Sequence, residues 1–563
     1  LETIFLTVMV MAVLGISALT EVLVAKGDIG RMNSVFKFGM QVWVFGAISS
    51  GVLLAWSWQH IRAILPRMQR IWQGVTVVAV LAVFAYPATA TPARLGDRYD
   101  REIPATLNGE AFMASPNATW SENGQNFDFS EDVAGINWIR QNVVGLPILL
   151  EAHAEAYRWD ARIATYTGLP TLIGWPWHET QQRSVTDVGN VLSARQNAVR
   201  RWYSELDSAS IFAELQNYGV EYIYVGRMER ALYGEQTGVA FAELAKAGKI
   251  TQVFSQGETR IYQVPVADHA PGVLKTGTLA KLPPAPLAQQ SLLTVENARL
   301  PEVTSPGWNP VTNPIVIVVL WLLAWYAIAL LGLAPAMWLG PNQWVWSRVI
   351  GLLLLGYLLW LPVSARIMYN STTGLALAIV LTILVSLWAL VRIGMRQKPQ
   401  PDTPVMQWVS WQDVPAAIRA GVQSISASLR AQWRTVAAFE GVFLLSFAVM
   451  VLIRMANPDL WHPAWGGEKP FEFGLLNAVL RSPVMPPYSP FFSGGTINYY
   501  YYGYVLMSLP IRLTGVMPAV GYNLVLASLY ALVMLGTAAV LWQIAQRRWV
   551  ALIGVLAMGV WGN

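Results

Sequence analysis

The sequence predicts an α-helical multi-pass membrane protein into which one soluble α/β domain is inserted. Three observations support this fold class. Only 13% of the 563 residues are charged, whereas about a quarter of the residues in soluble domains are charged. Apolar runs of about 20 residues, the length that crosses the hydrocarbon core of a bilayer, recur along the chain. The segment 91–312 is different, because its charges are spread throughout and it holds no run of that length.

We expect about nine membrane spans. They lie near residues 3–20, 38–56, 72–90, 314–338, 345–363, 373–393, 436–454, 518–543 and 547–561. The run 499–513 is not counted, because about 15 residues interrupted by Pro510 are short for a crossing. We interpret that run as a short juxtamembrane helix.

Basic residues indicate the orientation of these spans. Three arginines lie in the connection 57–71, and four arginines and a lysine lie in 394–435. Because cytoplasmic loops are enriched in Lys and Arg, we expect both connections inside. The alternation of spans then places four segments on the opposite face, namely 21–37, 91–312, 364–372 and 455–517. The prediction is a protein of the plasma membrane with an extracytoplasmic soluble domain.

The chain divides accordingly into six parts. These are spans 1–3 in 1–90, the soluble domain 91–263, a Pro-rich linker 264–312, spans 4–6 in 313–393, a cytoplasmic loop 394–435, and 436–563 with span 7, an outward loop, a tyrosine segment and spans 8–9. Within the cytoplasmic loop, 413–433 fits an amphipathic helix on the bilayer surface or an ordinary connecting helix equally well.

Short helical and extended patterns alternate in the segment 91–263, which indicates an α/β layer. Helices are expected at 131–143 and 209–218, and strands at 147–151, 163–166, 220–225 and 259–264. The chain has no cysteine, so a disulfide framework and a thiol nucleophile are both excluded. The formal net charge of +5 is modest for this length, and no basic footprint for nucleic acid is present.

The segment 454–504 carries the most informative ionisable residues. Asp459, Glu468 and Glu472 follow a span directly, and carboxylates at a membrane boundary are costly unless they are paired, hydrogen-bonded or metal-bound. We therefore interpret them as candidate catalytic residues. The structural alternative is that Asp459 caps a helix and that Glu468 forms a solvated pair with Lys469. The Pro and Gly content predicts an irregular loop here.

A tyrosine run closes this segment. Asn498 is followed by Tyr499, Tyr500, Tyr501 and Tyr502. On a helix such a run points phenols in all directions, so at most half can face one site. We interpret Asn498 and these tyrosines as candidates for binding the substrate or its phosphate. Anchoring at the membrane interface is the alternative interpretation for the tyrosines.

The stretch NPDLWHPAWGGEKPFEFGLLNAVLRSPVMPPYSPFFSGGTINYYYYGY resembles the signature of Chlor_Arch_YYY, a bacterial and archaeal membrane family whose members resemble GT-C glycosyltransferases. Residues 311–453, with GLLLLGYLLWL at 351–361, resemble the start of that family's domain. Residues 1–265 resemble its later part, through ALTEVLVAKGDIGRMNSVFKFGMQVW at 18–43, TGLPTLIGWPWHETQQR at 167–183 and YGVEYIYVGRMERALYG at 218–234. The order is swapped, which suggests the end of one copy and the beginning of the next in a double-length protein.

The resemblance implies a GT-C-like helix bundle and an acidic residue in the first outward loop, a position that Asp459 occupies. Glu468 or Glu472 would be the second carboxylate. The donor implied is a polyprenyl-phosphate sugar, whose departing phosphate needs cations. The candidates are His462, Lys469 and Arg481. A divalent ion, Mg²⁺ or Mn²⁺, could be held by Asp459 and Glu468 through oxygen ligands.

Two further groups of residues are candidates for substrate binding. In 21–37, Glu21, Arg31, Asn33 and Lys37 could contact a lipid phosphate, or they could be the ordinary polar flank of a span. In the soluble domain, an aromatic and ionisable patch could cover the site and stack on a sugar, or it could be structural. It consists of Trp175, Trp177, His178 and Glu179.

The function predicted from the sequence is inverting transfer of a sugar from a polyprenyl-phosphate donor to a glycan, lipid or protein acceptor on the outer face. One alternative is a transporter or flippase of lipid-linked glycans, which would place its polar residues near the bilayer midplane. Glu440 is the clearest charge within a span. The other alternative is a non-catalytic membrane scaffold with a sugar-binding ectodomain.

Overall fold

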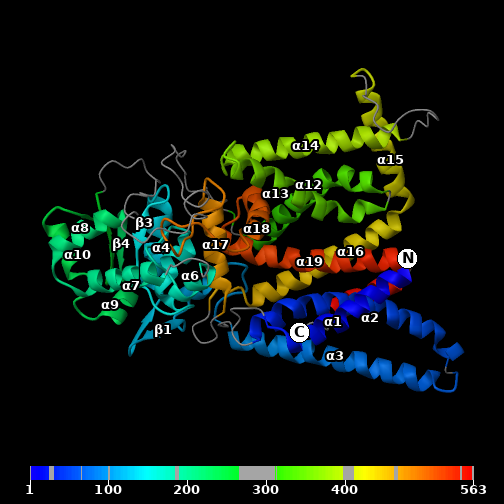
Figure 1. Ribbon diagram of the computed structural model, residues 1–563, viewed down its shortest axis with the longest axis horizontal. Coiled ribbons are helices and arrows are strands. Elements are labelled where there is room, and N and C mark those ends of the chain that lie inside the picture. The colour runs from blue at the N-terminus through cyan, green and yellow to red at the C-terminus, as the bar shows by residue number, and fades with distance from the viewer. Residues whose placement is uncertain are drawn as a thin grey trace.

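The computed structural model describes residues 2–24, 31–64, 66–98, 102–183, 189–265, 311, 313–340, 342–396, 411–461, 467–545 and 548–560. In this part of the chain, a bundle of long apolar helices carries an α/β region at one end (Figure 1). Eight helices are long and apolar enough to cross a membrane. The multi-pass membrane architecture predicted from the sequence is thus confirmed.

The long helices come from two parts of the chain. The first group is α1 Glu2–Val22, α2 Met32–Ile64 and α3 Gln69–Arg98. The second group is α12 Pro314–Leu339, α13 Ser347–Ser364, α14 Thr372–Met395, α16 Trp433–Ala456 and α19 Pro518–Ala545. The two groups pack together, because α2 lies against α19 and α20 Arg548–Val560.

Two of the predicted apolar runs form shorter helices. The ninth predicted span corresponds to α20, which has 13 residues and is therefore shorter than the roughly 20 residues that a crossing needs. The run 499–513 forms α18 Tyr501–Thr514, a helix of 14 residues with Pro510 inside it. The prediction of a short helix at this place is confirmed.

The predicted helix at 413–433 is α15 Val414–Ala431. It crosses the end of α14 so closely that glycines are required at the contact. A Cβ atom on Gly394 would lie 2.0 Å from the carbonyl oxygen of Ala417, and one on Gly421 would lie 2.3 Å from that of Leu390. Small residues allow helix backbones to approach in this way. The helix is therefore packed against α14 along this face.

Glu440, the charge predicted within a span, is paired. The Arg348 guanidinium of α13 donates to both of its carboxylate oxygens, at 2.9 and 2.6 Å, and the Tyr326 hydroxyl donates to Oε2 at 3.2 Å. Pairing of this kind is what makes a charge tolerable among membrane helices. These contacts give Glu440 a structural role in joining α12, α13 and α16.

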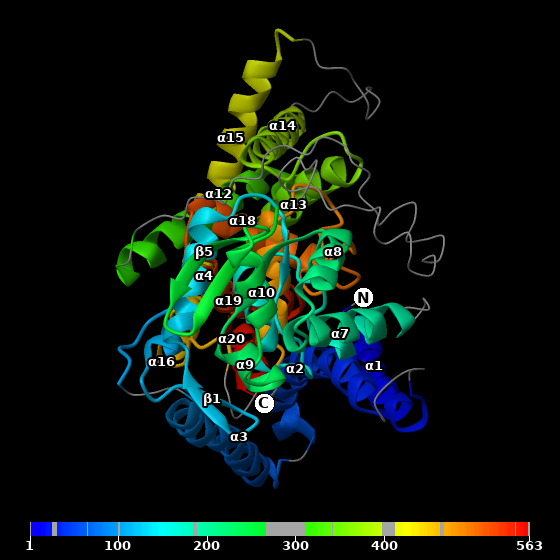
Figure 2. The ribbon, with the colours of Figure 1, turned by 90° about the vertical axis from the view of Figure 1, so that its left-hand side faces the viewer.

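The α/β region contains a four-stranded sheet of order β3-β4-β6-β5, in which β3 and β4 are parallel and the other neighbours antiparallel. Its strands are β3 Ile148–Leu150, β4 Val220–Val225, β5 Thr251–Gln256 and β6 Thr259–Gln263. A separate hairpin pairs β1 Thr119–Glu122 with β2 Gln125–Asp128. Figure 2 views this region end-on, with the membrane helices behind it.

Helices pack around this sheet. They are α4 Ser130–Asn142, α5 Arg162–Thr167, α6 Pro176–Gln182, α7 Gly189–Ser204, α8 Ser208–Tyr218, α9 Arg227–Tyr233 and α10 Val239–Lys246, with single 3-10 turns at Ala111–Ala114 and Trp159–Ala161. The predicted helices at 131–143 and 209–218 and the predicted strands at 147–151, 220–225 and 259–264 are confirmed within two residues at each end. Most of the linker 264–312 lies outside the described residues.

The strand predicted at 163–166 is wrong, because these residues form α5. The buried Glu151 carboxylate accepts hydrogen bonds from the backbone N–H groups of Ile163 and Ala164, at 2.7 and 2.9 Å. These are among the N–H groups that a helix N-terminus leaves unsatisfied. Gly168 ends the helix in the left-handed conformation, with φ at +71°. A contact from a distant segment thus overrides the local extended pattern.

The α/β region is fastened to the membrane helices by the loop that follows α17 Lys469–Arg481. Val484, Tyr488 and Phe492 of this loop belong to the hydrophobic core of the α/β region. The backbone N–H of Gly174 donates to the carbonyl of Phe491 at 2.8 Å. The irregular loop predicted for 454–504 is therefore interrupted by a helix of 13 residues, and its remainder packs against the α/β region.

The charge pattern places the segments 21–37, 364–372 and 455–517 on one face of the membrane, and described residues of all three lie at the same end of the bundle. Lys37 Nζ lies 3.5 Å from Tyr500 Oη, and the Asn370 N–H donates to the carbonyl of Pro483 at 2.8 Å. Helix α15 and the connection between α2 and α3 lie at the opposite end (Figure 1). The grouping of segments expected from the sequence is thus present in the structure.

Candidate functional site

The N-terminus of α17 carries the two carboxylates of the candidate site. Glu468 directly precedes the helix, and Glu472 lies in its first turn. Residues four apart share one face of a helix, and the positive end of the helix dipole stabilises negative charge there. Helix α17 stands between the α/β region and the membrane helices (Figure 1). The sequence therefore forms an acidic pair at the end of the bundle of apolar helices that faces the α/β region.

Glu472 has surroundings suited to proton transfer. Burial raises the pKa of its carboxyl, and the neighbouring negative charge of Glu468 raises it further. The Tyr522 hydroxyl donates to Glu472 Oε2 at 2.7 Å, and this hydrogen bond, together with the positive charge of Lys469, opposes the rise in pKa. A carboxyl whose pKa is shifted toward the working pH can serve as a general acid or base.

Tyr157 of the α/β region reaches over to Glu468. Its hydroxyl donates to Glu468 Oε1 at 3.4 Å. Tyr157 has a φ of +68°, in the left-handed region that a non-glycine residue rarely occupies, and its carbonyl accepts a hydrogen bond from Trp461 Nε1 at 3.0 Å. Such strained backbones gather at functional sites. The Tyr157 conformation is thus held from the membrane side of the junction.

Asp459 is buried, with 2% of its surface exposed. The Lys469 ammonium donates to its backbone carbonyl at 3.1 Å, which places a cation between Asp459 and the start of α17. The preceding residue is fixed by Asn523 of α19, whose amide donates to the carbonyls of Pro458 and Leu107, each at 2.9 Å. His462 lies outside the described residues.

Aromatic rings form a wall beside the carboxylates. Phe471 stacks on His178 with 4.3 Å between ring centroids, and on Phe491 with 5.4 Å. Tyr499 meets Phe471 edge-on at 5.8 Å, and His178 meets Tyr157 at 5.1 Å. Burial lowers the pKa of His178 to about 4, so this side chain is neutral at pH 7. The wall joins α6, α17 and the tyrosine run.

The predicted patch at 175–179 is divided by the structure. His178 reaches the site, and its buried Nε2 has no hydrogen-bond partner among the described residues. Trp175 is buried and donates from Nε1 to Asp160 Oδ1 at 3.1 Å. Glu179 is fully buried and paired with Arg183 at 2.7 Å, which is a structural role. Trp177 is 54% exposed.

The tyrosine run divides as well. Tyr499 and Tyr500 are exposed, and Lys37 of α2 lies 5.8 Å from the Tyr500 ring centroid. Tyr501 accepts a hydrogen bond from Trp360 Nε1 at 3.1 Å, and Tyr502 packs edge-on against the same Trp360 ring. Tyr499 thus borders the site, Tyr500 lies beside Lys37, and the last two tyrosines pack on α13.

The remaining predicted site residues lie outside this constellation or at its edge. The Asn498 amide donates to the carbonyl of Gln182 at 2.6 Å. Arg31 pairs with Glu21 at 2.8 Å on an exposed surface, and Asn33 lies one helical turn before Lys37 on α2. Lys37 therefore provides the contact between the 21–37 segment and the tyrosine run.

The structure does not bring Arg481 to the carboxylates. It is the last residue of the 13-residue helix α17, which places it about 18 Å along the helix axis from Lys469 at 1.5 Å per residue. Its guanidinium donates to the carbonyls of Val143, Gly145 and Thr167, at 2.7, 3.0 and 3.1 Å. As a partner for the phosphate beside Glu472, Arg481 is thus corrected to a residue that ties α17 to the α/β region.

No group of three or more His, Cys, Asp or Glu side chains gathers as a metal site in the part of the chain that the structure describes. The divalent ion considered for Asp459 and Glu468 stays a prediction. Four residues of the site are not predicted from the sequence, namely Tyr157, Trp461, Phe471 and Tyr522. Trp461 and Phe471 lie within the signature stretch, which was the one available signal for them.

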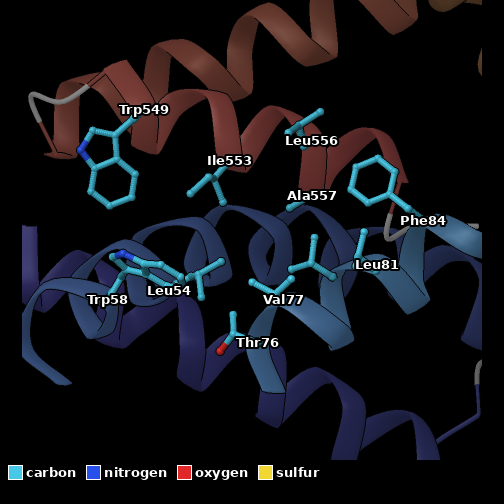
Figure 3. A pocket seen from close by; sticks show the side chains of 11 residues that line it. Leu54, Trp58, Thr76, Val77, Leu81, Phe84, Trp549, Ile553, Leu556 and Ala557 are labelled. Atoms are coloured by element: carbon cyan, nitrogen blue, oxygen red, sulfur yellow. The ribbon is translucent and has the colours of Figure 1, made fainter. Parts of the chain in front are cut away.

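An apolar cavity of about 440 Å³ lies among α2, α3 and α20. Its walls are almost entirely hydrocarbon, with Leu54, Val77, Phe84 and Ile553 facing one another and Thr76 at the edge (Figure 3). A site that handles anions and protons needs polar groups. This groove therefore differs in chemistry from the boundary site at α17.

Comparison with known proteins gives one family. Residues 353–563, which include α17, the tyrosine run and α19, match the family described as "Uncharacterized membrane protein (DUF2298)". Neither the curated proteins nor the solved structures provide a match to the chain. The family match and the eight apolar helices agree that this is an integral membrane protein.

Proposed function

We propose that the protein is a GT-C-like glycosyltransferase that moves a sugar from a polyprenyl-phosphate donor to a glycan, lipid or protein acceptor. The observation that carries this proposal is the acidic pair of Glu468 and Glu472 at the N-terminus of α17, bordered by aromatic rings and located where the α/β region meets the membrane helices. Enzymes that act at an anomeric carbon commonly use two carboxyl groups whose different surroundings give them different pKa values.

The proposed reaction assigns one role to each group. Glu472 accepts the proton of the acceptor hydroxyl, because its surroundings fit a general base. The acceptor oxygen then bonds to the anomeric carbon, while the bond from that carbon to the phosphate oxygen breaks and its electron pair leaves with the phosphate. Glu468 stabilises the positive charge that develops on the sugar. The ammonium of Lys469 stabilises the departing phosphate.

Binding surfaces for the two substrates lie around this centre. The stacked rings of Phe471 and His178, with Tyr499 edge-on, provide apolar faces for a sugar. Lys37 and Tyr500 stand at the side of α2 and provide a cation and a phenol for a lipid phosphate. Asp459, which the resemblance to Chlor_Arch_YYY implies as the acidic residue, remains the second candidate for the base.

Transfer of labelled sugar in proteoliposomes tests this proposal. The wild-type chain is expected to transfer sugar from a polyprenyl-phosphate donor, and Glu472→Gln and Glu468→Gln are each expected to reduce the rate by about tenfold or more. Equal rates in all three proteins would remove the proposed mechanism. Donor binding without transfer by the wild type would instead favour the transporter or the scaffold.

We further propose that the α/β region and the site face the non-cytoplasmic side. This follows from the basic connections at the opposite end of the bundle. The chain has no cysteine, so single cysteines can report sidedness cleanly. A membrane-impermeant maleimide added to intact cells should label Glu155→Cys in the α/β region.

The matched control is Trp411→Cys, beside the start of α15. Glu155 has an 87% exposed side chain and Trp411 is 89% exposed, so solvent access does not distinguish the two positions. Trp411→Cys should react only after the membrane is permeabilised. The reverse pattern of labelling would place the carboxylates on the cytoplasmic side and refute the orientation proposed here.

A further inference from the structure

A polar cavity lies beside the C-terminal half of α17, whereas the acidic pair lies at the N-terminus of this helix. The cavity has a volume of about 260 Å³ and is bounded by α4, α5, the C-terminal half of α17 and the start of α19. Its lining includes Asn137, Arg140, Gln141, Tyr166, Arg481 and Pro518. The cavity therefore sits where the α/β region meets the first residues of a membrane-spanning helix.

Two guanidinium groups line this cavity, and that of Arg140 is balanced by its ion pair with Glu110. The lining contains two arginines and no Asp or Glu. Burial lowers the pKa of Arg481 to about 10, and the positive charge of Arg140 lowers it further. Both guanidinium groups are still charged at neutral pH, and each feels the field of the other. Arg140 is paired with Glu110, which lies outside the lining, at 2.8 Å.

A buried hydroxyl adds an independent observation. Tyr166 lines the cavity and is 2% exposed, and its Oη has no hydrogen-bond partner among the described residues. A buried polar group without a partner costs free energy in the empty protein. A ligand that accepts a hydrogen bond from Tyr166 would remove this cost.

Two further features favour an anion. The cavity borders Pro518, the first residue of the 28-residue helix α19, and the dipole of a helix favours negative charge at its N-terminus. Asn137 and Gln141 lie one turn apart on α4, where their exposed amides can donate to an incoming ligand.

We propose that this cavity binds a phosphate- or carboxylate-bearing anion, either free in solution or as the headgroup of a membrane lipid. The assignment does not depend on the proposed glycosyltransferase, because none of the residues that line the cavity belongs to the acidic pair or to its aromatic wall. The cavity would hold a ligand at the seam between the α/β region and α19.

The test uses the full chain in nanodiscs of phosphatidylcholine, titrated with inorganic phosphate by calorimetry. A parallel arm compares the thermal stability of the protein in phosphatidylcholine with that in phosphatidylglycerol, because a ligand of the native state raises its stability. Saturable binding of phosphate would identify a site for free anions. Stabilisation by phosphatidylglycerol alone would identify a lipid headgroup site.

Three variants decide whether either signal comes from this cavity. Tyr166→Phe removes a hydroxyl that has no partner, so the fold is retained, and affinity is expected to fall about tenfold through the loss of one hydrogen bond to a charged ligand. Asn137→Asp adds a negative charge at the mouth and should weaken binding by a similar factor. Asn126→Asp adds the same charge on the exposed β1–β2 hairpin and should leave binding unchanged.

The proposal would be overturned by two results. One is the absence of both phosphate binding and phosphatidylglycerol stabilisation in the wild type. The other is equal affinity in the wild type, Tyr166→Phe and Asn137→Asp. Sugar transfer is not the readout of this test, so a failure of the glycosyltransferase proposal would leave its result intact.

Discussion

Glu472→Gln is expected to reduce the rate of sugar transfer by about 100-fold or more, since a positioned general base contributes roughly 10² to 10⁴ to catalysis. Glutamine keeps the size of the side chain and can still accept the hydrogen bond from the Tyr522 hydroxyl. The loss would therefore reflect the missing base and not a missing contact. The measurement is the initial rate of transfer in proteoliposomes under saturating donor.

The pH dependence of transfer gives a sharper form of this prediction. A general base must be unprotonated, so activity should rise with pH through the raised pKa of Glu472. Tyr522→Phe removes a hydrogen bond that lowers this pKa, so the acidic limb should move to higher pH. Glu468→Gln removes a negative charge that raises it, so the limb of its residual activity should move to lower pH.

These two opposite shifts form the control for each other. A variant that merely loosened the site would lower the rate without moving the limb in a defined direction. Full activity in Glu472→Gln would exclude this residue as the base. In that case a loss of activity confined to Asp459→Asn would transfer the role to Asp459, as the resemblance to GT-C enzymes implies.

The sequence was sufficient for the membrane helices because their signal is local. A helix in lipid makes all its backbone hydrogen bonds within itself. An apolar run of the right length is therefore enough to predict a membrane-spanning helix. The prediction was less accurate where tertiary contacts decide. Residues 163–166 have an extended pattern, yet the distant Glu151 carboxylate binds the N–H groups at their helical start.

The candidate site could be predicted only in part, for a related reason. Glu468 and Glu472 were found from their position after a span, but the contact of Glu472 with Tyr522 joins residues 50 positions apart. Tyr522 lies in an apolar run, where no pattern marks it as functional. Adjacency in the sequence also does not show which side chains share the site. His178 faces the site, whereas the neighbouring Glu179 turns inward and pairs with Arg183.

The orientation of the four side chains in the tyrosine run also could not be predicted from the sequence in full. Their sequence predicts that no more than half can face one site, and the structure turns Tyr499 and Tyr500 outward and packs Tyr501 and Tyr502 on α13. Which two tyrosines pack inward depends on where α18 begins and on the Trp360 ring. That information lies in another helix and not in the run itself.

The second large effect is expected in the α/β region, where Arg162→Met should lower the free energy of unfolding by roughly 3–5 kcal/mol, the usual cost of breaking a buried ion pair. The Arg162 side chain is fully buried and contacts Asp132 and Glu229, each at 2.8 Å. It also lies 4.9 Å from the centre of the Tyr224 ring. Methionine would fill the space and leave two carboxylates without their cation.

The matched control is Arg201→Met, which removes an arginine from a partly exposed pair with Glu214. Surface pairs contribute at most about 1 kcal/mol, so this variant should unfold nearly as the wild type does. Chemical denaturation in detergent, followed by tryptophan fluorescence, can measure both changes.

The pH dependence of the Arg162→Met effect separates lost charge pairing from lost packing. Burial raises the pKa of Glu229, but the charge and hydrogen bonds of Arg162 outweigh it and hold the pKa below its ordinary value. In the wild type, the stability from Glu229 is present above its unfolded pKa and is lost as the pH falls through the lowered folded pKa. Without Arg162, burial dominates, the folded pKa rises above the unfolded value, and protonation on acidification relieves the buried charge. The difference in free energy of unfolding between the two proteins should therefore shrink as the pH is lowered from 7 toward the pKa values of the carboxyl groups. A difference that stays constant with pH would show that lost packing, and not lost charge pairing, accounts for the destabilisation.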